Sequence, residues 1–263
     1  MLTMKEISKT YGTGTLRTHA LRSFSLDVRE GDFVAVMGPA DSGKTTFLNI
    51  AGLLESFDGG VYTLEGSDVA ALSDRERARL RAEKIGFVFQ TLNLSPDISV
   101  FDNVDVPLRD RGFSRAERRE RIEAALQRVG LAGSAKHLPP QLSDGQQQRV
   151  GIARALAGEP RVLLADEPTG RLDISTARAV LDLLAEINAA GTTIVMVTRD
   201  PAVAERAKRS VRLLDGALGE DPAERGRDSR ASTPSGGATH THSAGWSFSE
   251  APPGFQAPAS AEE

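Results

Sequence analysis

One short stretch of the chain carries residue types that bind phosphate. The pattern G-x-x-x-x-G-K-[ST] is matched by Gly38-Pro39-Ala40-Asp41-Ser42-Gly43-Lys44-Thr45, and Thr46 follows it. Its two glycines let the backbone curl so that successive N–H groups face one anion, and a helix N-terminus behind them adds partial positive charge. In this geometry Lys44 would reach the β- and γ-phosphates of a nucleotide, and the hydroxyl of Thr45 would ligate Mg²⁺.

The residues on either side of this stretch provide the context that the motif requires. Residues 32–37 form a mostly apolar run typical of a buried strand, and residues 45–54 are typical of a helix. A strand followed by a glycine-rich loop and a helix is the arrangement in which this motif binds nucleotides. We therefore call Gly38–Thr46 the phosphate loop.

Three further polar residues follow predicted strands and could complete the chemistry. Asp166 and Glu167 come directly after the apolar run 162–165, and Gln90 follows the run 85–89. A carboxylate at such a strand end can hold Mg²⁺, and the neighbouring Glu167 is the candidate general base that activates water. Gln90 is placed to contact both the metal ion and the water.

Strands and helices alternate along most of the chain. β-structure is expected over residues 1–37, with further strands at 60–64, 85–89, 161–165, 192–198 and 211–216. Helices are expected after the capping patterns Ser73-x-x-Glu76 and Ser114-x-x-Glu117, and over 146–157 and 177–189. Continuous apolar strands between helices predict an α/β fold with a mostly parallel sheet, and residues from about 92 to 140 predict a helical insertion.

The composition restricts the classes of function. The chain has 263 residues, 40% of them hydrophobic, and a net charge of −4, which does not indicate nucleic acid as the main partner. It contains no cysteine, which excludes disulfides, thiolate metal sites and thiol catalysis. No apolar run approaches the roughly 20 residues that span a bilayer, and we expect no signal peptide. The Pro-, Gly- and Ser-rich residues 219–263 predict a disordered tail.

A second motif identifies a family resemblance. The run Leu142-Ser143-Asp144-Gly145-Gln146 resembles the L-S-G-G-Q signature of the ATP-binding subunits of ABC transporters, and the resemblance covers residues 1 to about 218. It implies that Ser143, Asp144, Gly145 and Gln146 start a helix that caps the γ-phosphate of an ATP bound to the opposite subunit. It also implies an adenine-stacking role for Tyr11, and the Walker A loop for Gly38–Thr45. Gln90 becomes the Q-loop residue, Asp166 the Walker B aspartate, Glu167 the catalytic glutamate and Asp173 the D-loop aspartate.

The resemblance further implies an architecture, cofactors and partners. The expected fold is a RecA-like P-loop NTPase core with an N-terminal antiparallel β subdomain and a helical subdomain at about 92–150. The expected ligands are ATP and Mg²⁺. Such subunits form a head-to-tail dimer, here with a second copy or a paralogue, on a membrane-spanning permease at the cytoplasmic face of the cell membrane. Residues 48–53, 87–94 and 103–108 look like the macrolide-export and lipoprotein-release branch.

Four residues depart from the family pattern. Asp41 stands where a small residue is usual, Asp144 replaces the first glycine of the signature, and Arg171 lies in the D-loop. Arg199 occupies the position of a histidine that contacts the γ-phosphate; it could hold that phosphate but cannot shuttle a proton. A carboxylate such as Asp144 about 4 Å from a phosphate charge would cost roughly 4 kcal/mol at an effective dielectric near 20. One hypothesis is that the two arginines neutralise the two aspartates across the dimer interface; independent drift is the alternative.

Two other functions remain open from the sequence. Arg199 and Asp144 favour a regulatory module that binds ATP but hardly hydrolyses it, whereas Lys44, Asp166 and Glu167 favour a working ATPase. A soluble ABC ATPase of cell division or of nucleic-acid metabolism is the third reading. The absence of a basic stripe from the sequence weakens its nucleic-acid version.

Overall fold

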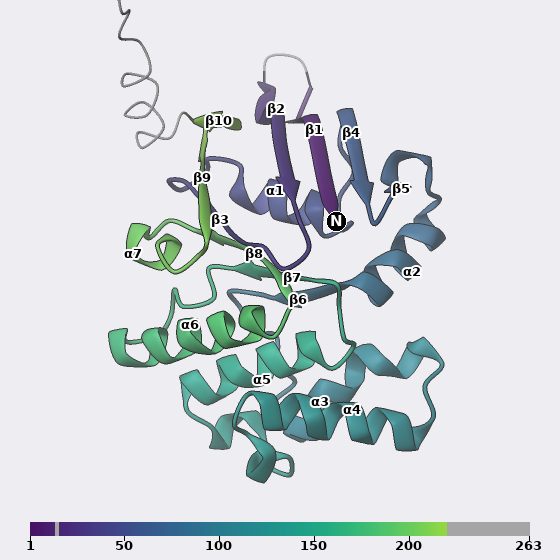
Figure 1. Ribbon diagram of the computed structural model, residues 1–263, viewed down its shortest axis with the longest axis vertical. Helices are drawn as coiled ribbons and strands as arrows, with labels where there is room; N and C mark the ends of the chain where they lie inside the picture. Colours follow the sequence, from purple (N-terminus) through teal and green to yellow (C-terminus); the bar gives the residue numbers. More distant parts are fainter. Residues whose placement is uncertain (14–15, 220–263) are drawn as a thin grey trace, which may run out of the picture. The chain divides into compact units, whose positions relative to one another are not determined.

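The computed structural model describes residues 1–13 and 16–219, which fold into two sheets and surrounding helices (Figure 1). The four-stranded sheet has the order β2-β1-β4-β5, from strands β1 (Leu2–Tyr11), β2 (Thr18–Val28), β4 (Gly59–Leu64) and β5 (Ser67–Asp68). All its pairings are antiparallel. The antiparallel subdomain expected near the N-terminus is therefore present.

The second sheet has six strands in the order β10-β9-β3-β8-β7-β6. They are β3 (Phe33–Met37), β6 (Ile85–Val88), β7 (Val162–Asp166), β8 (Thr193–Thr198), β9 (Arg209–Leu214) and β10 (Ala217–Gly219). All pairings are parallel except that between β9 and β10. This arrangement confirms the expected α/β fold with a mostly parallel sheet.

Within residues 1–13 and 16–219, seven α-helices connect and cover these strands (Figure 1). They are α1 (Lys44–Ala51), α2 (Asp74–Lys84), α3 (Val100–Asp105), α4 (Arg115–Arg128), α5 (Asp144–Leu156), α6 (Ile174–Ala189) and α7 (Pro201–Ala204). Short 3₁₀ turns lie at η2 (Val69–Ala71), η3 (Val106–Arg111), η4 (Ala132–Ser134) and η5 (Pro139–Gln141). Among the residues that the structure describes, no helix is long and apolar enough to cross a membrane.

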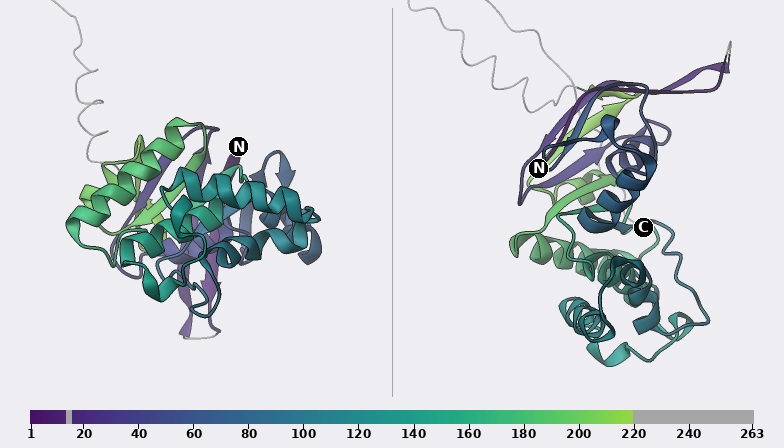
Figure 2. Two further views of the ribbon diagram at one scale, coloured as in Figure 1. Left: turned by 90° about the horizontal axis from the view of Figure 1, so that it is seen from below. Right: turned by 90° about the vertical axis from the view of Figure 1, so that its right-hand side faces the viewer.

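Side chains alternate between the two faces of the central strands and contribute to two separate hydrophobic cores. On β3, Val34 and Val36 pack with α1 and the antiparallel sheet, whereas Phe33 and Ala35 face the core that contains α5 and α6. Both faces of the parallel sheet are thus covered, which explains why its strands read as continuous apolar runs. The side view of Figure 2 shows helices α3, α4 and α5, in teal, projecting on one side of the strands. These helices lie between β6 and β7 in the chain, so the helical insertion is present.

Local capping patterns set several helix boundaries. The reciprocal capping boxes Ser73–Glu76 and Ser114–Glu117 both form, as predicted. Helices α5 and α6 start two and three residues earlier than expected, because Ser143 and Asp173 act as N-caps there. The tail expected over 219–263 lies outside the described residues except for Gly219, which ends β10.

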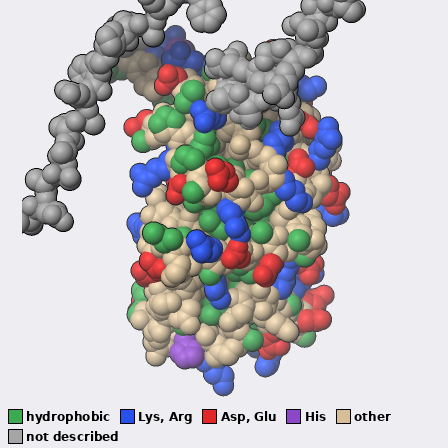
Figure 3. Space-filling view, turned by 60° about the vertical axis from the view of Figure 1, so that its left-hand side comes forward, with side chains coloured by type: hydrophobic (Ala, Val, Ile, Leu, Met, Phe, Trp, Pro, Cys, Tyr) green, Lys and Arg blue, Asp and Glu red, His purple; other side chains and the backbone are tan. Residues whose placement is uncertain are grey.

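The register of the parallel strands aligns their carboxyl ends. Met37 of β3 pairs with Thr198 of β8, Asp166 of β7 pairs with Val197 of β8, and Val88 of β6 pairs with Ala165 of β7. The loops that follow these strands therefore leave from one edge of the sheet, which is where ligands bind in open α/β sheets. On the face shown in Figure 3, basic and acidic side chains are interspersed.

Candidate nucleotide-binding site

The phosphate loop turns back on itself before α1. Gly43 has φ of 99°, and a Cβ there would lie 2.2 Å from the carbonyl oxygen of Ala20, so a side chain is excluded. Lys44 is buried, and its Nζ donates to the carbonyl oxygen of Gly38 at 2.8 Å and to that of Pro39. The ammonium group is thus held against its own loop by neutral carbonyl oxygens.

Two features of this loop leave donors available for an anion. Helix α1 begins without a side-chain N-cap and has no acidic residue in its first turn. The hydroxyl of Ser42 is buried and has no hydrogen-bond partner in the structure. Free N–H groups at a helix N-terminus and a buried hydroxyl without a partner fit the binding of a phosphate group.

Glu167, one of the two predicted acids, is held by the end of β8. Thr198, the last residue of β8, is buried and donates from Oγ1 to Oε2 of Glu167 at 3.3 Å. The same hydroxyl accepts a hydrogen bond from the backbone N–H of Asp200 at 3.1 Å. The backbone N–H of Glu167 donates to the carbonyl oxygen of Val197 at 3.0 Å. Both the backbone and the carboxylate of Glu167 are therefore anchored to β8.

The charges of the predicted site act on one another. Burial is the main cause that lowers the pKa of Lys44, and the guanidinium of Arg199 acts in the same direction. The carboxylates of Glu167, Asp166 and Asp41 oppose this lowering. Burial and then the charge of Glu167 raise the pKa of Asp166, whereas Lys44 lowers it. The fold thus brings these five predicted site residues into one electrostatic cluster.

Tyr11 and Thr46 connect the antiparallel sheet to the phosphate loop. The hydroxyl of Tyr11 shares a hydrogen bond of 3.3 Å with Oγ1 of Thr46, and the side chain is 40% exposed. Lys9 lies with its Nζ 5.5 Å from the centroid of the Tyr11 ring. Tyr11 therefore stands next to the loop with part of its ring accessible.

The signature residues lie at a different place from the phosphate loop. Ser143 and Gln146 form a reciprocal capping box at the start of α5, with Ser143 N–H donating to Gln146 Oε1 at 3.0 Å. Asp173 caps α6 by accepting from the backbone N–H groups of Ser175 and Thr176, and its carboxylate also accepts from the hydroxyl of Ser175. Side-chain hydrogen bonding with Ser175 and then Thr176 is the main cause that lowers the pKa of Asp173, and the backbone hydrogen bonds add to it. Among the hydrogen bonds and ion pairs of residues 1–13 and 16–219, none joins Ser143–Gln146 or Asp173 to the phosphate loop. The hydrogen bonds and ion pairs of the described residues therefore do not join these two parts of the predicted site.

The oxygen donors present fit Mg²⁺ held jointly with a nucleotide. Thr45 offers an exposed hydroxyl at the start of α1, and Asp166 offers a partly buried carboxylate at the end of β7. Within the described part of the chain, no group of three or more His, Cys, Asp and Glu side chains could hold a metal ion alone. Mg²⁺ commonly binds through one or two protein oxygens together with substrate phosphates, so this sparse donor set suits it.

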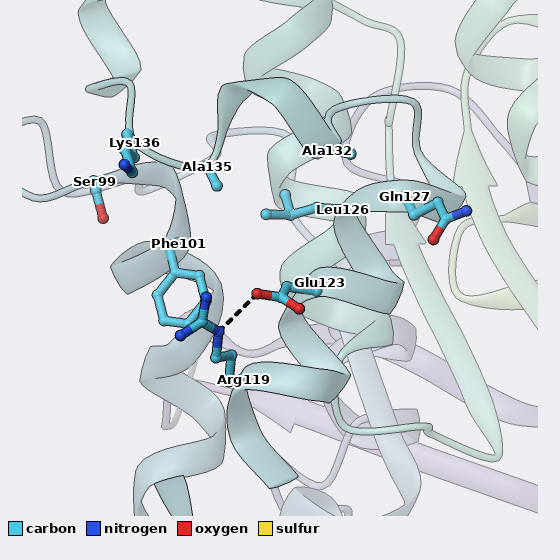
Figure 4. A pocket seen from close by; sticks show the side chains of 9 residues that line it. All are labelled: Ser99, Phe101, Arg119, Glu123, Leu126, Gln127, Ala132, Ala135 and Lys136. Atoms are coloured by element: carbon cyan, nitrogen blue, oxygen red, sulfur yellow. Dashed lines mark hydrogen bonds and ion pairs between the residues drawn. The ribbon is translucent and has the colours of Figure 1, made fainter. Parts of the chain in front are cut away.

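Cavities also lie outside the phosphate loop. One of about 420 Å³ is lined by residues of three segments, among them Gln90, Asp144, Gln148 and Arg171. Another of about 710 Å³ lies on the helical insertion, where Phe101 and Leu126 line it and Arg119 forms an ion pair with Glu123 at 2.8 Å (Figure 4). The larger cavity contains no predicted site residue.

Sequence reasoning missed the role of Thr198 in positioning Glu167. Thr198 is the last residue of a predicted β-branched strand, and a polar side chain at a strand end is the feature of the sequence that could have pointed to it. The contact depends on the register between β7 and β8, which the sequence does not specify.

Comparison with known proteins agrees with this geometry. A family model described as ABC transporter matches residues 21–170. Two uncharacterized ABC transporter ATP-binding proteins of Bacillus subtilis are similar to this chain. YknY is 44% identical over 218 residues, covering 83% of this chain and 95% of YknY. YvrO is 45% identical over 231 residues, covering 88% of this chain and all of YvrO.

A longer relative and a solved structure add to the comparison. The macrolide export ATP-binding/permease protein MacB of Escherichia coli is 44% identical over 218 residues, but this chain spans only 34% of its length. The ATP-binding cassette MJ0796, solved as a dimer in a post-hydrolysis state with ADP and Pi, is 42% identical with a TM-score of 0.76. That match covers 84% of this chain and 97% of MJ0796. The chain therefore belongs to the ABC transporter family and is an ATP-binding subunit of an ABC transporter.

Proposed function

We propose that this chain binds Mg²⁺–ATP in a dimer and hydrolyses it to ADP and phosphate to drive a separate membrane-spanning permease. The observation that carries the proposal is the cluster of Lys44, Asp166 and Glu167 beside an uncapped helix N-terminus. A cation, a metal-binding carboxylate and a candidate base in one place are the parts that phosphoryl transfer to water requires.

Each residue of the cluster has a role in this proposal. Lys44 releases the carbonyl oxygens of its own loop and binds the β- and γ-phosphates. Thr45, Asp166 and Gln90 would hold Mg²⁺, which when bound offsets charge on the phosphates. Glu167, held by Thr198, accepts a proton from the attacking water. Tyr11 stacks on the adenine with the accessible part of its ring.

The second half of the site comes from another subunit. Ser143, Gly145 and Gln146 lie at the N-terminus of α5, where backbone N–H groups can bind a γ-phosphate. Because no hydrogen bond or ion pair among the described residues joins them to the phosphate loop of the same chain, we propose that they close over the nucleotide of a second copy or a paralogue. The dimeric state of the similar cassette MJ0796 supports this arrangement.

Its relatives support a proposal for the location and branch of the protein. MacB joins an ATP-binding part and a permease part in one protein, whereas YknY and YvrO, both named as ATP-binding proteins, are matched over 95% and 100% of their length. We propose that the permease is a separate subunit and that this chain acts on the cytoplasmic face of the membrane, in the branch that includes macrolide export. A division-associated ABC module is the alternative assignment of the same dimer. Co-purification with a transporter permease or with a division protein distinguishes the two.

Arg199 and Asp144 favour a second candidate function, in which the chain binds ATP but hydrolyses it poorly. The guanidinium of Arg199 acts to lower the pKa of Lys44, which supports placing its permanent positive charge near Lys44, Asp166 and Glu167. Arg199 could hold the γ-phosphate, but it cannot exchange protons as a histidine does. Impaired hydrolysis would make the chain a regulatory subunit or the partner of a fully active one.

Steady-state ATP hydrolysis by the purified protein tests both functions. We expect turnover by the native chain and its loss in Glu167→Gln, with ATP binding retained. Glu120→Gln on the exposed face of α4 is the matched control and should hydrolyse normally. A native chain that binds ATP without turnover, and that gains activity through Arg199→His, would establish the regulatory function instead. A chain that does not bind ATP would contradict both.

A further inference from the structure

The N-termini of α5 and α6 are held against each other. A Cβ at Gly145 would lie 2.3 Å from Cγ2 of Thr176, so only glycine allows this close approach. Asp173 fixes the start of α6 by accepting hydrogen bonds from backbone N–H groups of its first turn. Asp144 directly precedes Gly145, and Arg171 lies two residues before Asp173. The segments that carry Asp144 and Arg171 are therefore packed together.

Asp144 and Arg171 line the same cavity of about 420 Å³. Both residues are exposed, and neither forms an ion pair with any residue among those described. They are also two of the four positions where the sequence departs from the family pattern. Asp144 and Arg171 therefore have opposite charges, line one cavity and can form an ion pair with each other.

A third residue of this cavity supplies a donor that has no acceptor. Gln148 is only 5% exposed, and its Nε2 has no hydrogen-bond partner in the structure. It lies one turn after Asp144 on α5, and residues four apart on a helix share a face. A buried amide without a partner costs free energy, so an acceptor that reaches it is favoured. A carboxylate at position 144 can provide that acceptor, whereas a glycine cannot.

We propose that Asp144 turns into this cavity and pairs with Arg171 of the same protomer while it accepts a hydrogen bond from Nε2 of Gln148. Arg171 is then a positioning residue that directs the Asp144 carboxylate away from the N-terminus of α5. This pairing within one chain differs from neutralisation across the dimer interface, and it requires no nucleotide.

The pairing should also affect how the N-terminus of α5 binds the ATP of the partner subunit. This step rests on the proposed function. With Asp144 held by Arg171 and Gln148, the N–H groups at the start of α5 keep their partial positive charge toward the approaching phosphate. Without Arg171, the carboxylate would be free to face that phosphate and repel it. Loss of Arg171 should therefore weaken ATP-driven dimerisation, and loss of the Asp144 charge should restore it.

The first test is a double-mutant cycle on the nucleotide-free monomer. Asp144→Asn, Arg171→Gln and the double variant are unfolded in urea at concentrations at which the chain is monomeric. We expect non-additive effects, with a coupling of about 2- to 5-fold in the unfolding equilibrium constant, which is the range of partly exposed ion pairs. Additive effects would refute pairing within the protomer. Arg178→Gln, an exposed arginine on α6, is the control and should not couple to Asp144→Asn.

The second test measures ATP-driven dimerisation by light scattering, in a Glu167→Gln background that prevents turnover. Arg171→Gln should raise the dissociation constant of the dimer about tenfold or more, and addition of Asp144→Asn should return it close to the parent value. A double variant as weak as Arg171→Gln alone would overturn the proposal. Rescue here with additivity in the monomer would mean pairing across the interface, which also overturns it. If the parent does not bind ATP, the proposed function fails, and the monomer cycle still decides the pairing.

Discussion

The hydroxyl of Thr198 should control hydrolysis without contacting the nucleotide. Thr198→Val keeps the size and β-branching of this side chain, which is 1% exposed, but removes its oxygen. The variant loses the hydrogen bond to Oε2 of Glu167 and the acceptor for the backbone N–H of Asp200. Glu167 keeps its backbone hydrogen bond to Val197, so the change frees the carboxylate rather than the whole turn.

The two lost hydrogen bonds affect different quantities, namely kcat and the free energy of unfolding. A hydrogen bond to a charged acceptor contributes about 1.5–3 kcal/mol, and the 3.3 Å distance indicates the lower end of this range. A loss of about 1.4 kcal/mol in the transition state lowers kcat about tenfold. The N–H of Asp200 left without an acceptor should reduce the free energy of unfolding by about 1 kcal/mol.

Steady-state kinetics and urea unfolding of the same preparations provide the measurements. We expect kcat to fall about tenfold in Thr198→Val while KM changes less than about twofold, since the hydroxyl acts on the base and not on ATP binding. Thr198→Ser, which keeps the oxygen, is the control and should retain most of the activity. The reasoning is refuted if Thr198→Val turns over at the native rate, or if Thr198→Ser is equally impaired.

Three further predictions follow from the site and the fold. Tyr11→Ala should weaken ATP binding about 5- to 10-fold in a fluorescent-nucleotide assay, and Tyr11→Phe should bind like the native chain, because stacking needs the ring and not the hydroxyl; equal losses would contradict a stacking role. The pKa of Asp166 is raised by burial, so its ionisation lowers native stability as pH rises through the folded-state pKa. Asp166→Asn should therefore stabilise the nucleotide-free protein against urea at pH 7 but not below pH ~3.9, the unfolded-state pKa. The same variant should abolish the Mg²⁺-dependent binding of ATP. An equal gain in stability at both pH values would exclude burial of the carboxylate as the cause. Ser114→Ala removes the N-cap of α4 and should cost about 1 kcal/mol in unfolding with ATP binding unchanged; a loss of ATP binding would show that α4 influences the site.

Interactions within a few residues of the chain were predictable from the sequence. The capping boxes at Ser73 and Ser114 formed as predicted, because the N-cap and its partner are three residues apart and need no tertiary contact. The phosphate loop is local for the same reason, since Gly43, Lys44 and the first turn of α1 are adjacent in the chain. Continuous apolar strands likewise indicated a parallel sheet covered on both faces.

The order and register of the strands were decided only by the tertiary structure. β3, β7 and β8 lie far apart in the sequence, yet their pairing places Lys44 beside Asp166 and brings Thr198 to Glu167. A shift of one residue would turn these side chains to the other face of the sheet, and no local pattern specifies the pairing. The close contact between Gly145 and Thr176 and the buried amide of Gln148 likewise arise from helix packing. The sequence by itself determined which residues are candidates for binding phosphate and metal, because this depends on residue type and short spacing. The tertiary structure decided which of them share one site, because their proximity depends on packing between distant segments.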